Sequence, residues 1–348
     1  MSGSTVVKQR VRAVLPRPVV RSLKSAVVTT RLARAFTYDM VRYRRYSSSI
    51  DETKDRHNLQ AVITERYHSL EKGMSLPAPR PAFGARPLGD VVRYLSLYID
   101  RYGVDDFAKR VGAVLRSYLE FNTLLAVETA DIPEYVGICR LLRIVGGEDS
   151  AAGTRKVRRE HVLNTVAPVG LDFFTSRNSV RQFTTQPISL DEVQFAATAA
   201  LHAPAVCNRQ FGRIHCYLDR ASIARILQVQ GGANGFADQL SGLAIITTNL
   251  RSYWNDTQRN QAWVDGGLFA MNFILGLHAQ GLGSVSLNWS KGPTTDQELR
   301  RVTGIRQEEA VVMLVGFGHL RTEYRVASSP RQALESVLVV DTPVSVCD

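Results

Sequence analysis

The sequence has few cysteines, few acidic residues near its start and no long apolar run. Its 348 residues include four cysteines, none in the C-x-x-C spacing of a metal or redox pair. We therefore expect free thiols, a reducing compartment and no metal site. No apolar run approaches the roughly 20 residues of a membrane-spanning helix, and charges interrupt every run that could serve as a signal peptide. These absences favour a cytoplasmic protein, and a hydrophobic content of 45% is ordinary for a globular core.

Positive charge is concentrated at the start of the chain. Residues 1–50 contain eleven Lys and Arg against one acid, Asp39, so they hold +10 of the net charge of +11. Apolar residues such as Val20, Leu23 and Val27 recur there at helical spacing. Residues 1–50 thus form either a basic amphipathic arm on the inner face of an anionic membrane or a disordered solubilising tail. An import presequence or an arm that contacts an acidic partner are further alternatives. The remaining residues are nearly neutral, so nucleic acid is not an expected partner.

Residues 51–160 are predicted to form a helical N-terminal domain, because apolar residues recur there at three- and four-residue spacing. The expected helices are Asn58–Ser69, Leu88–Tyr102, Asp105–Thr129 and Ile132–Val145. Prolines between residues 76 and 84 forbid a helix, and Gly146–Lys156 is the expected linker. The run His68–Gly73 could help to shape a polar site with Arg80–Gly84. The favoured alternative is a helix end with Gly73 as its left-handed cap.

Residues 161–348 are predicted to form an α+β domain, in which helices alternate with strands. An apolar helical stretch, Val162–Phe174, comes first, and a capping box at Ser189–Glu192 opens a helix that runs to about His202. The further expected elements are strands at Gly212–Asp219, Leu243–Thr248 and Val311–Gly318, and helices at Ala221–Gln230 and Gln261–Gln280. The last helix is apolar nearly all round, so it must be buried inside the domain or in a dimer.

Five short motifs occur in this part in a fixed order. They are Arg177-Asn178-Ser179-Val180-Arg181, the turn Ala203–Phe211, a central helix ending in Gly281-Leu282-Gly283-Ser284, the strand Val311–Gly318, and Arg331 before Leu334. This ordered set, over about residues 165 to 340, resembles the FMN-dependent nitroreductase family. The resemblance implies a three-layer α+β fold with a central mixed or antiparallel sheet, here preceded by an all-helical domain. It also implies a homodimer.

The resemblance assigns one group of residues to the FMN phosphate. Arginine is a planar donor fork suited to phosphate, and serine adds an orientable hydroxyl. The phosphate-side residues implied by the resemblance are Arg177, Ser179 and Arg331, and Asn178 is a further expected cofactor-binding residue. The family often has a second basic residue just before the late arginine. Ser329 and Pro330 stand there in this sequence, and Arg325 could substitute.

A second group is assigned to the flavin ring. Arg181 occupies the family position of the cation that stabilises the reduced ring, and it is the predicted catalytic residue. The other ring-side residues implied by the resemblance are Pro204, Ala205, Val206, Asn208, Asn234, Leu287, Asn288 and Trp289. In this family the turn that contains the first four comes from the other subunit. Ala205 and Val206 replace the usual small hydroxyl residues, and Trp289 either narrows the space above the ring or packs in the core.

These features predict an FMN-dependent oxidoreductase. It would take two electrons from NADH or NADPH and pass them to an undetermined small-molecule acceptor. No separate nicotinamide domain is expected, because Gln230–Gly235 does not match G-x-G-x-x-G. The alternative is a non-catalytic membrane-surface or scaffolding protein with a vestigial flavin pocket, which the missing hydroxyls at Ala205 and Val206 favour.

Overall fold

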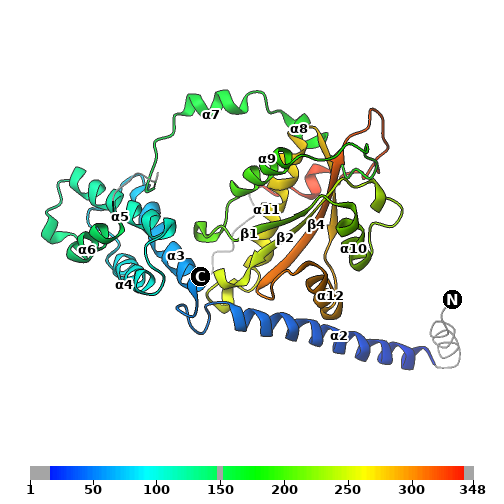
Figure 1. The fold of residues 1–348 in the computed structure, drawn as a ribbon, viewed down its shortest axis with the longest axis horizontal. Helices are drawn as coiled ribbons and strands as arrows, with labels where there is room; N and C mark the ends of the chain where they lie inside the picture. Colours follow the sequence, from blue (N-terminus) through cyan, green and yellow to red (C-terminus); the bar gives the residue numbers. More distant parts are fainter. Residues whose placement is uncertain (1–15, 147–151, 341–348) are drawn as a thin grey trace.

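The computed structural model describes residues 16–146 and 152–340. Three parts follow one another along the chain (Figure 1): a long helix, a bundle of four helices, and a sheet with helices on both faces. The described chain is therefore α+β with an N-terminal helical part, as the sequence predicts.

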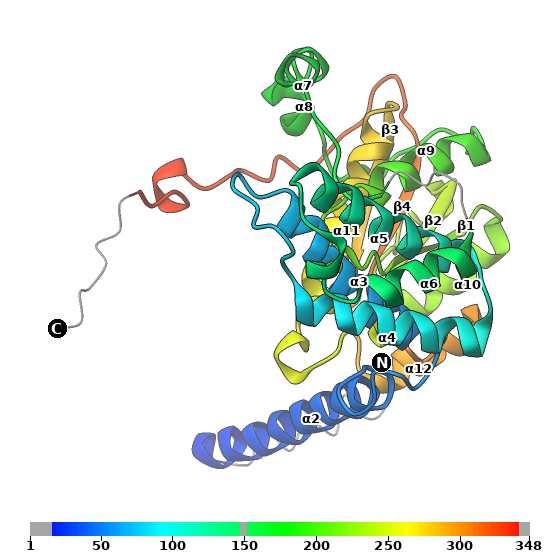
Figure 2. The same ribbon diagram turned by 90° about the vertical axis from the view of Figure 1, so that its left-hand side faces the viewer.

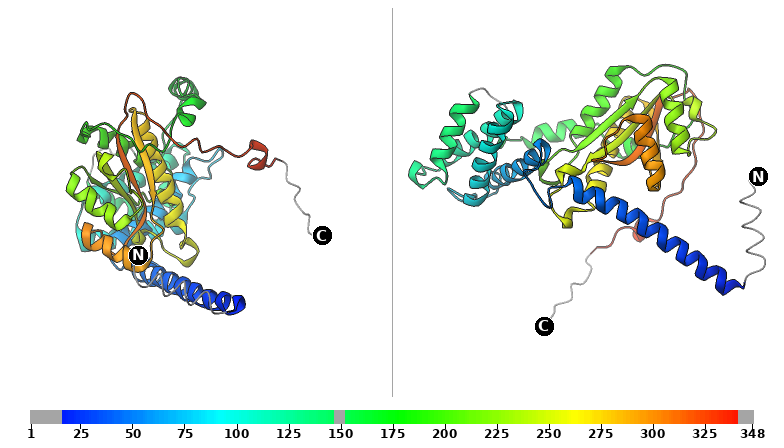
Figure 3. Two further views of the ribbon diagram at one scale, coloured as in Figure 1. Left: turned by 90° about the vertical axis from the view of Figure 1, so that its right-hand side faces the viewer. Right: turned by 60° about the horizontal axis from the view of Figure 1, so that its bottom comes forward.

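The long helix α2, Arg17–Tyr46, contacts the rest of the molecule through its C-terminal half. The Tyr38 hydroxyl donates to Asp296 over 2.6 Å, and the Arg42 guanidinium donates to the Glu309 carbonyl over 2.6 Å. The N-terminal half projects away from the body (Figures 1 and 3), and its apolar residues such as Leu23 are exposed. No helix within residues 16–146 and 152–340 has both the length and the apolar character needed to cross a bilayer.

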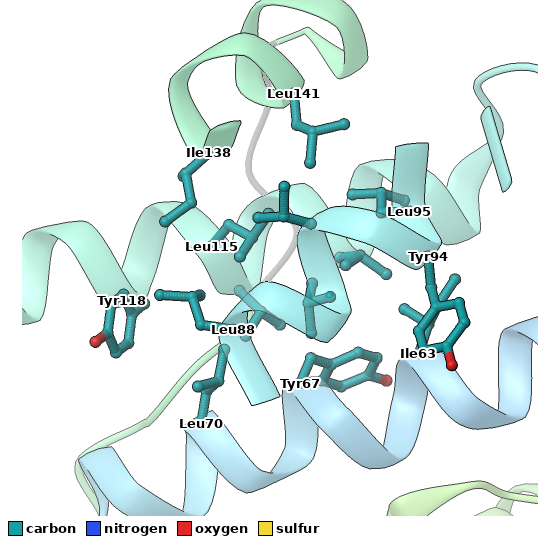
Figure 4. Packing of buried hydrophobic residues seen from close by; sticks show 14 of the residues in the cluster. Ile63, Tyr67, Leu70, Leu88, Tyr94, Leu95, Leu115, Tyr118, Ile138 and Leu141 are labelled. Carbon is teal, nitrogen blue, oxygen red and sulfur yellow. The ribbon is translucent and has the colours of Figure 1, made fainter. Parts of the chain in front are cut away.

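The bundle packs four helices around one apolar core. They are α3 (Arg56–Met74), α4 (Ala85–Tyr102), α5 (Asp106–Leu124) and α6 (Tyr135–Val145). The carboxylate of Asp55 accepts from two backbone N–H groups at the start of α3, and that of Asp105 accepts from the Ala108 N–H at the start of α5. The core residues labelled in Figure 4 come from all four helices: Ile63, Tyr67, Leu70, Leu88, Tyr94, Leu95, Leu115, Tyr118, Ile138 and Leu141. Helix α5 is shorter than predicted, because a turn follows Leu124.

The polar run His68–Gly73 lies at the C-terminal end of α3. Gly73 is not a left-handed cap, because the helix continues to Met74 and ends at Ser75. A Cβ atom on Gly73 would lie 2.0 Å from the Phe83 ring, so glycine is needed for this close approach. Glu71 accepts from the Gly153 N–H over 3.2 Å and thereby ties the helix end to the segment that leaves the bundle.

The segment between the bundle and the sheet carries two short helices, α7 (Arg159–Val166) and α8 (Leu171–Thr175). The sequence predicts one apolar helix at Val162–Phe174, and this is wrong. Residues 167–170, with Pro168 among them, separate the two helices because proline removes a backbone donor. Both helices expose apolar side chains. The predicted linker falls partly outside the described residues.

The sheet has four strands in the order β1-β2-β4-β3, and every pair is antiparallel. The strands are β1 (Gly212–Tyr217), β2 (Gly242–Asn249), β3 (Leu282–Asn288) and β4 (Glu309–His319). The sequence analysis misses β3, because it assigns residues 281–284 to the end of the central helix. That helix ends at His278, and β3 starts at Leu282 after Gly281, whose φ is +76°.

Two helices cover each face of the sheet. Helices α9 (Leu190–Leu201) and α11 (Gln261–His278) pack on one face, and α10 (Arg220–Gln230) and α12 (Pro293–Thr303) pack on the other. Ser189 and Glu192 form the predicted capping box. The sequence analysis misses α12, which has few apolar positions. The short 3-10 turns are η1 (Thr129–Asp131), η2 (Val206–Asn208), η3 (Ala237–Gln239), η4 (Leu250–Ser252), η5 (Asp256–Gln258) and η6 (Leu334–Ser336).

The contact between α9 and α11 leads to a stability prediction. A Cβ on Gly276 would lie 2.8 Å from the Cβ of Ala199 and 2.9 Å from the Cα of Ala196, whereas a Cβ on Gly267 would meet nothing within 4 Å. Gly276→Ala should lower the free energy of unfolding in urea by about 1–3 kcal/mol, because the packed backbones must separate. The control Gly267→Ala should raise it by about 0.5–1 kcal/mol through helix propensity. Equal effects of the two substitutions would contradict the close helix packing.

Candidate functional site

The segment Arg177–Arg181 is held beside β3 by its backbone. The Val180 N–H donates to the Ser284 carbonyl over 2.8 Å, and Ser179 forms a parallel bridge with Ser284. Val180 is 2% exposed and packs in the core under α10 and α12. Because side chains alternate along an extended segment, burial of Val180 turns Ser179 and Arg181 to the opposite side. Both are exposed, and Arg177 is partly buried.

Arg181 lies next to the loop that follows α10. Its guanidinium carbon is 5.8 Å from the centroid of the Phe236 ring, which is itself buried. Asn234 is exposed two residues before Phe236, between the buried anchors Ala233 and Phe236. The structure therefore brings the predicted residues Arg181 and Asn234 to the same part of the molecule.

Gln230 joins this loop to the end of β3. Its side chain is buried, its Nε2 donates to the Asn288 carbonyl over 3.2 Å, and its Oε1 accepts from the Gly232 N–H over 2.6 Å. Three predicted groups thus gather around β3: residues 177–181, the loop 230–236 and residues 287–289. Sequence reasoning misses Gln230, because nothing in its local pattern shows which backbone groups it will satisfy.

A further cation lies beside this loop. The Lys291 ammonium would be 3.9 Å from a Cβ on Gly231. None of the ion pairs among the described residues involves Arg177, Arg181 or Lys291. These cations are thus not neutralised by carboxylates within the described chain. The sequence analysis misses Lys291, which follows β3 and belongs to none of the five motifs.

Trp289 is packed rather than free. Its indole N–H donates to Asp296 over 3.0 Å, and its ring packs against the core under α10 and α12. Asp296 also accepts from the Arg300 guanidinium and the Tyr38 hydroxyl. Burial by itself would raise the pKa of Asp296, but these donors hold it below its ordinary value. Leu287, two residues earlier, is buried in the same core, while Asn288 is exposed.

The predicted turn Pro204–Asn208 is fixed from two sides. The carboxylate of Asp265 at the start of α11 accepts from the Val206 N–H at 3.3 and 3.4 Å. Burial raises the pKa of Asp265. The Arg209 side chain, 1% exposed, donates to the Ser252 carbonyl over 2.6 Å and pairs with Glu65 of α3 over 2.9 Å.

The backbone of this turn is in an uncommon conformation. Cys207, Asn208 and Gln210 all have φ near +50°, in the left-handed region that non-glycine residues rarely adopt. Such conformations persist where surrounding contacts hold the backbone in place. Here the hydrogen bonds of Asp265 and Arg209 supply these contacts. Pro204 and Asn208 are exposed at its surface, and Ala205 and Val206 are partly buried. Sequence reasoning misses the anchoring residues Asp265 and Arg209.

The turn Pro204–Asn208 has different contacts from the residues gathered around β3. Its hydrogen bonds link it to α11, η4 and α3, and none of those found in the described chain joins it to Arg177, Ser179 or Arg181. A single chain therefore does not join the two halves of the predicted ring site through hydrogen bonds.

Arg331 lies on the exposed C-terminal segment, which extends away from the body (Figure 2). No hydrogen bond or ion pair within the described residues links it to Arg177 or Ser179. The segment at Arg325 is connected more closely, because the backbone N–H of Arg325 donates to the Gln182 side chain over 3.2 Å. The Asn178 side chain donates to the Ser176 carbonyl over 2.9 Å.

Comparison with known proteins identifies one matching family model. Residues 228–319, from the end of α10 to the end of β4, match the model described as Nitroreductase family. No curated protein matches the sequence. This range contains Asn234, Leu287, Asn288 and Trp289, whereas Arg177–Arg181, the turn Pro204–Asn208 and Arg331 lie outside it.

Several solved structures are similar at low sequence identity. The FMN-dependent nitroreductase of Clostridium difficile is 18% identical, with 46% of this chain and 92% of that chain covered and a TM-score of 0.39. The NADPH:FMN oxidoreductase of Vibrio harveyi, solved with NAD+, is 18% identical over 51% of this chain and 79% of that one, with a TM-score of 0.41. Nitroreductase A of Vibrio parahaemolyticus is 18% identical over 51% and 77%, also with a TM-score of 0.41. Only the family model bears on the family, and its match is to a nitroreductase-family domain at residues 228–319, within the sheet part that follows the helical bundle.

Proposed function

We propose that the protein is an FMN-dependent oxidoreductase that transfers two electrons from NADH or NADPH to a small acceptor. The observation that carries the proposal is the set of unneutralised cations and backbone groups around β3, within and beside the nitroreductase-family domain. A flavin, when bound, supplies reversible two-electron chemistry that side chains cannot provide. The residues of the chain then have three tasks: to hold the phosphate, to place charge at the ring and to shape the space above it.

The donor set suits a phosphate. Arg177 and Ser179 offer a guanidinium fork and a hydroxyl on a segment whose backbone is fixed to β3. Asn178 lies between them. Arg331 would complete the set from the C-terminal segment, and Arg325, whose backbone N–H donates to the Gln182 side chain, is the proposed substitute. Lys291 adds a cation from the loop after β3.

A second set suits the ring. Arg181, beside Phe236, would place a fixed positive charge at the pyrimidine edge, where reduction adds negative charge. Asn234, Leu287, Asn288 and Trp289 come from the loop and strand end that Gln230 joins. On the opposite side, residues Pro204, Ala205, Val206 and Asn208 would contribute backbone groups and one amide from a second subunit. Asp265 and Arg209 hold that turn in place before the ring binds.

The proposed function is tested first by the colour of the purified protein. We expect a yellow preparation that NADH or NADPH bleaches.

A substitution tests the phosphate site. Arg177→Ala should weaken FMN binding by about tenfold or more, because one charged hydrogen bond contributes about 1.5–3 kcal/mol. The control Arg220→Ala removes an exposed charge on α10 and should leave the flavin dissociation constant unchanged.

A colourless protein that does not bind added FMN would instead support the alternative of a scaffold with a vestigial pocket. Unchanged FMN affinity in Arg177→Ala would remove Arg177 from the phosphate site.

Arg181 is proposed to act on the ring and not on the phosphate. Arg181→Ala should therefore retain FMN, yet show a more negative reduction potential and slower reduction by the nicotinamide. Potentiometric titration with a reference dye and stopped-flow absorbance measure the two quantities. A potential equal to that of the wild type would exclude Arg181 from this role.

We further propose that the protein is a homodimer through α11. One face of this helix exposes Trp263, Val264, Leu268 and Met271, with exposed fractions of 46, 53, 43 and 42%. Four large apolar side chains on one helix face favour contact with another protein surface. Met271→Glu should shift sedimentation towards the mass of one chain, whereas Leu124→Glu, at an 87% exposed site on the bundle, should not. A wild type that sediments as one chain would contradict the dimer.

The projecting half of α2 supports a proposed contact with the inner face of the membrane. Residues 17–33 carry Arg17, Arg21, Lys24 and Arg31 and no acid, and their apolar residues are exposed. A basic amphipathic helix of this kind binds anionic lipid surfaces. The full-length protein should co-sediment with phosphatidylserine vesicles and remain in solution with phosphatidylcholine vesicles. Equal behaviour with both lipids would argue against the membrane contact.

A further inference from the structure

A cavity of about 360 Å³ lies between the helical bundle and the sheet part. Its walls come from α3 and α5 on one side and from the turn η2, the start of β1 and the loop after β2 on the other. The basic residues of its lining are His57, Arg110, Arg209 and Arg213. Asn208, the exposed end of the turn that we propose to face the flavin, also lines it.

The charged side chains of the lining are basic. Among the described residues it includes three arginines and one histidine and no aspartate or glutamate, and one of the arginines, Arg209, is paired with Glu65 behind the wall. Arg110 is exposed on α5 and takes part in none of the ion pairs among the described residues. Arg213 is 44% exposed and forms an ion pair with Glu309 at 3.6 Å, which leaves the hydrogen-bond donors of its guanidinium open to a second anion. These two side chains can therefore accept a further anionic partner.

Two observations inside the cavity wall agree with this charge. Arg209 is 1% exposed, and its Nε has no acceptor among the described residues. Burial lowers the pKa of His57. Asp55 offsets part of that effect, and Arg251 and Arg213 add to it. After burial, the two arginines thus contribute to the lowered pKa of His57.

The cavity also has apolar walls. Tyr67 and Phe211 are 5% and 6% exposed, and Phe107 is partly buried. Tyr67 and Phe107 come from the bundle, and Phe211 comes from the segment before β1. Aromatic side chains offer flat surfaces on which a planar body can stack. A guanidinium fork matches a carboxylate or phosphate in a bidentate manner.

We propose that this cavity binds a small aromatic anion. Its carboxylate or phosphate group would lie between Arg110 of the bundle and Arg213 of β1. The identification of the cavity as the acceptor subsite rests on the proposed function, because only then does Asn208 face a flavin. Binding of the anion itself depends only on the cavity. In this arrangement the helical extension supplies one of the two cations, so the bundle selects the substrate class.

The experiment compares matched probes with the full-length protein. The probes are 4-nitrobenzoate, its neutral methyl ester and 4-nitrophenyl phosphate, and the dissociation constants are measured by isothermal titration calorimetry. We expect both anions to bind about tenfold or more tightly than the ester, since each charged hydrogen bond contributes that much. Arg110→Gln and Arg213→Gln should each remove this preference. Lys109→Gln, which removes the neighbouring exposed charge on α5 outside the cavity, should retain it.

A second readout separates this proposal from the proposed function. The reduction of 4-nitrobenzoate and of its ester by NADH or NADPH is compared through kcat/KM. Charge-selective binding without any reduction would support the cavity while the oxidoreductase proposal fails. The cavity proposal would be overturned if the anions and the ester bound with equal affinity, or if both arginine variants still preferred the anions. Reduction of the probes in either case would leave the flavin function standing.

Discussion

The backbone hydrogen bond between Val180 and Ser284 is the constraint on which the candidate flavin site depends. It docks an extended segment, far away in sequence, alongside the edge strand β3. Burial of Val180 then determines the orientation of its two neighbours, because successive side chains in an extended segment point to opposite sides. Arg181 consequently lies beside Phe236, and Gln230 brings the loop before Phe236 to the end of the same strand. One strand thus organises residues from three parts of the chain.

The helical bundle is joined to the sheet part by buried and partly buried polar contacts. Asn58 donates to the Arg251 carbonyl over 3.0 Å, Asp55 pairs with Arg251 over 2.7 Å, and Glu65 pairs with Arg209 over 2.9 Å. These contacts come from α3 and its N-cap residue Asp55, and they converge on Arg209, directly after the turn Pro204–Asn208, and on Arg251 in η4. Removing one partner of a buried ion pair leaves an uncompensated charge, so such contacts fix geometry strongly. The bundle is therefore coupled mechanically to the turn proposed to meet the flavin, and it forms one wall of the cationic cavity.

Much of the architecture could be predicted from the sequence because its signals are local. The capping box at Ser189, the alternation in β1 and the apolar run of β2 each depend on residues close together in the chain. The missed elements lack such signals. β3 combines glycine and serine with a few apolar residues and follows the helix α11 directly, and α12 is largely polar. The sequence predicts Gly73 as a helix cap, but the glycine is needed for close packing against the ring of Phe83, ten residues away in the chain.

The sequence by itself determined the fold class of the protein, the order of its motifs and the uneven distribution of its charge, because composition and short spacings carry that information. It also predicted the residues that we propose for the cofactor. Only the tertiary structure decided that Gln230, Lys291, Asp265 and Arg209 support them, since these contacts join residues dozens of positions apart. It decided as well that Arg110 and Arg213, 103 residues apart by their numbering, line one cavity. The physical reason is that a side chain's electrostatic partners are set by the packing of whole elements, which no local pattern specifies.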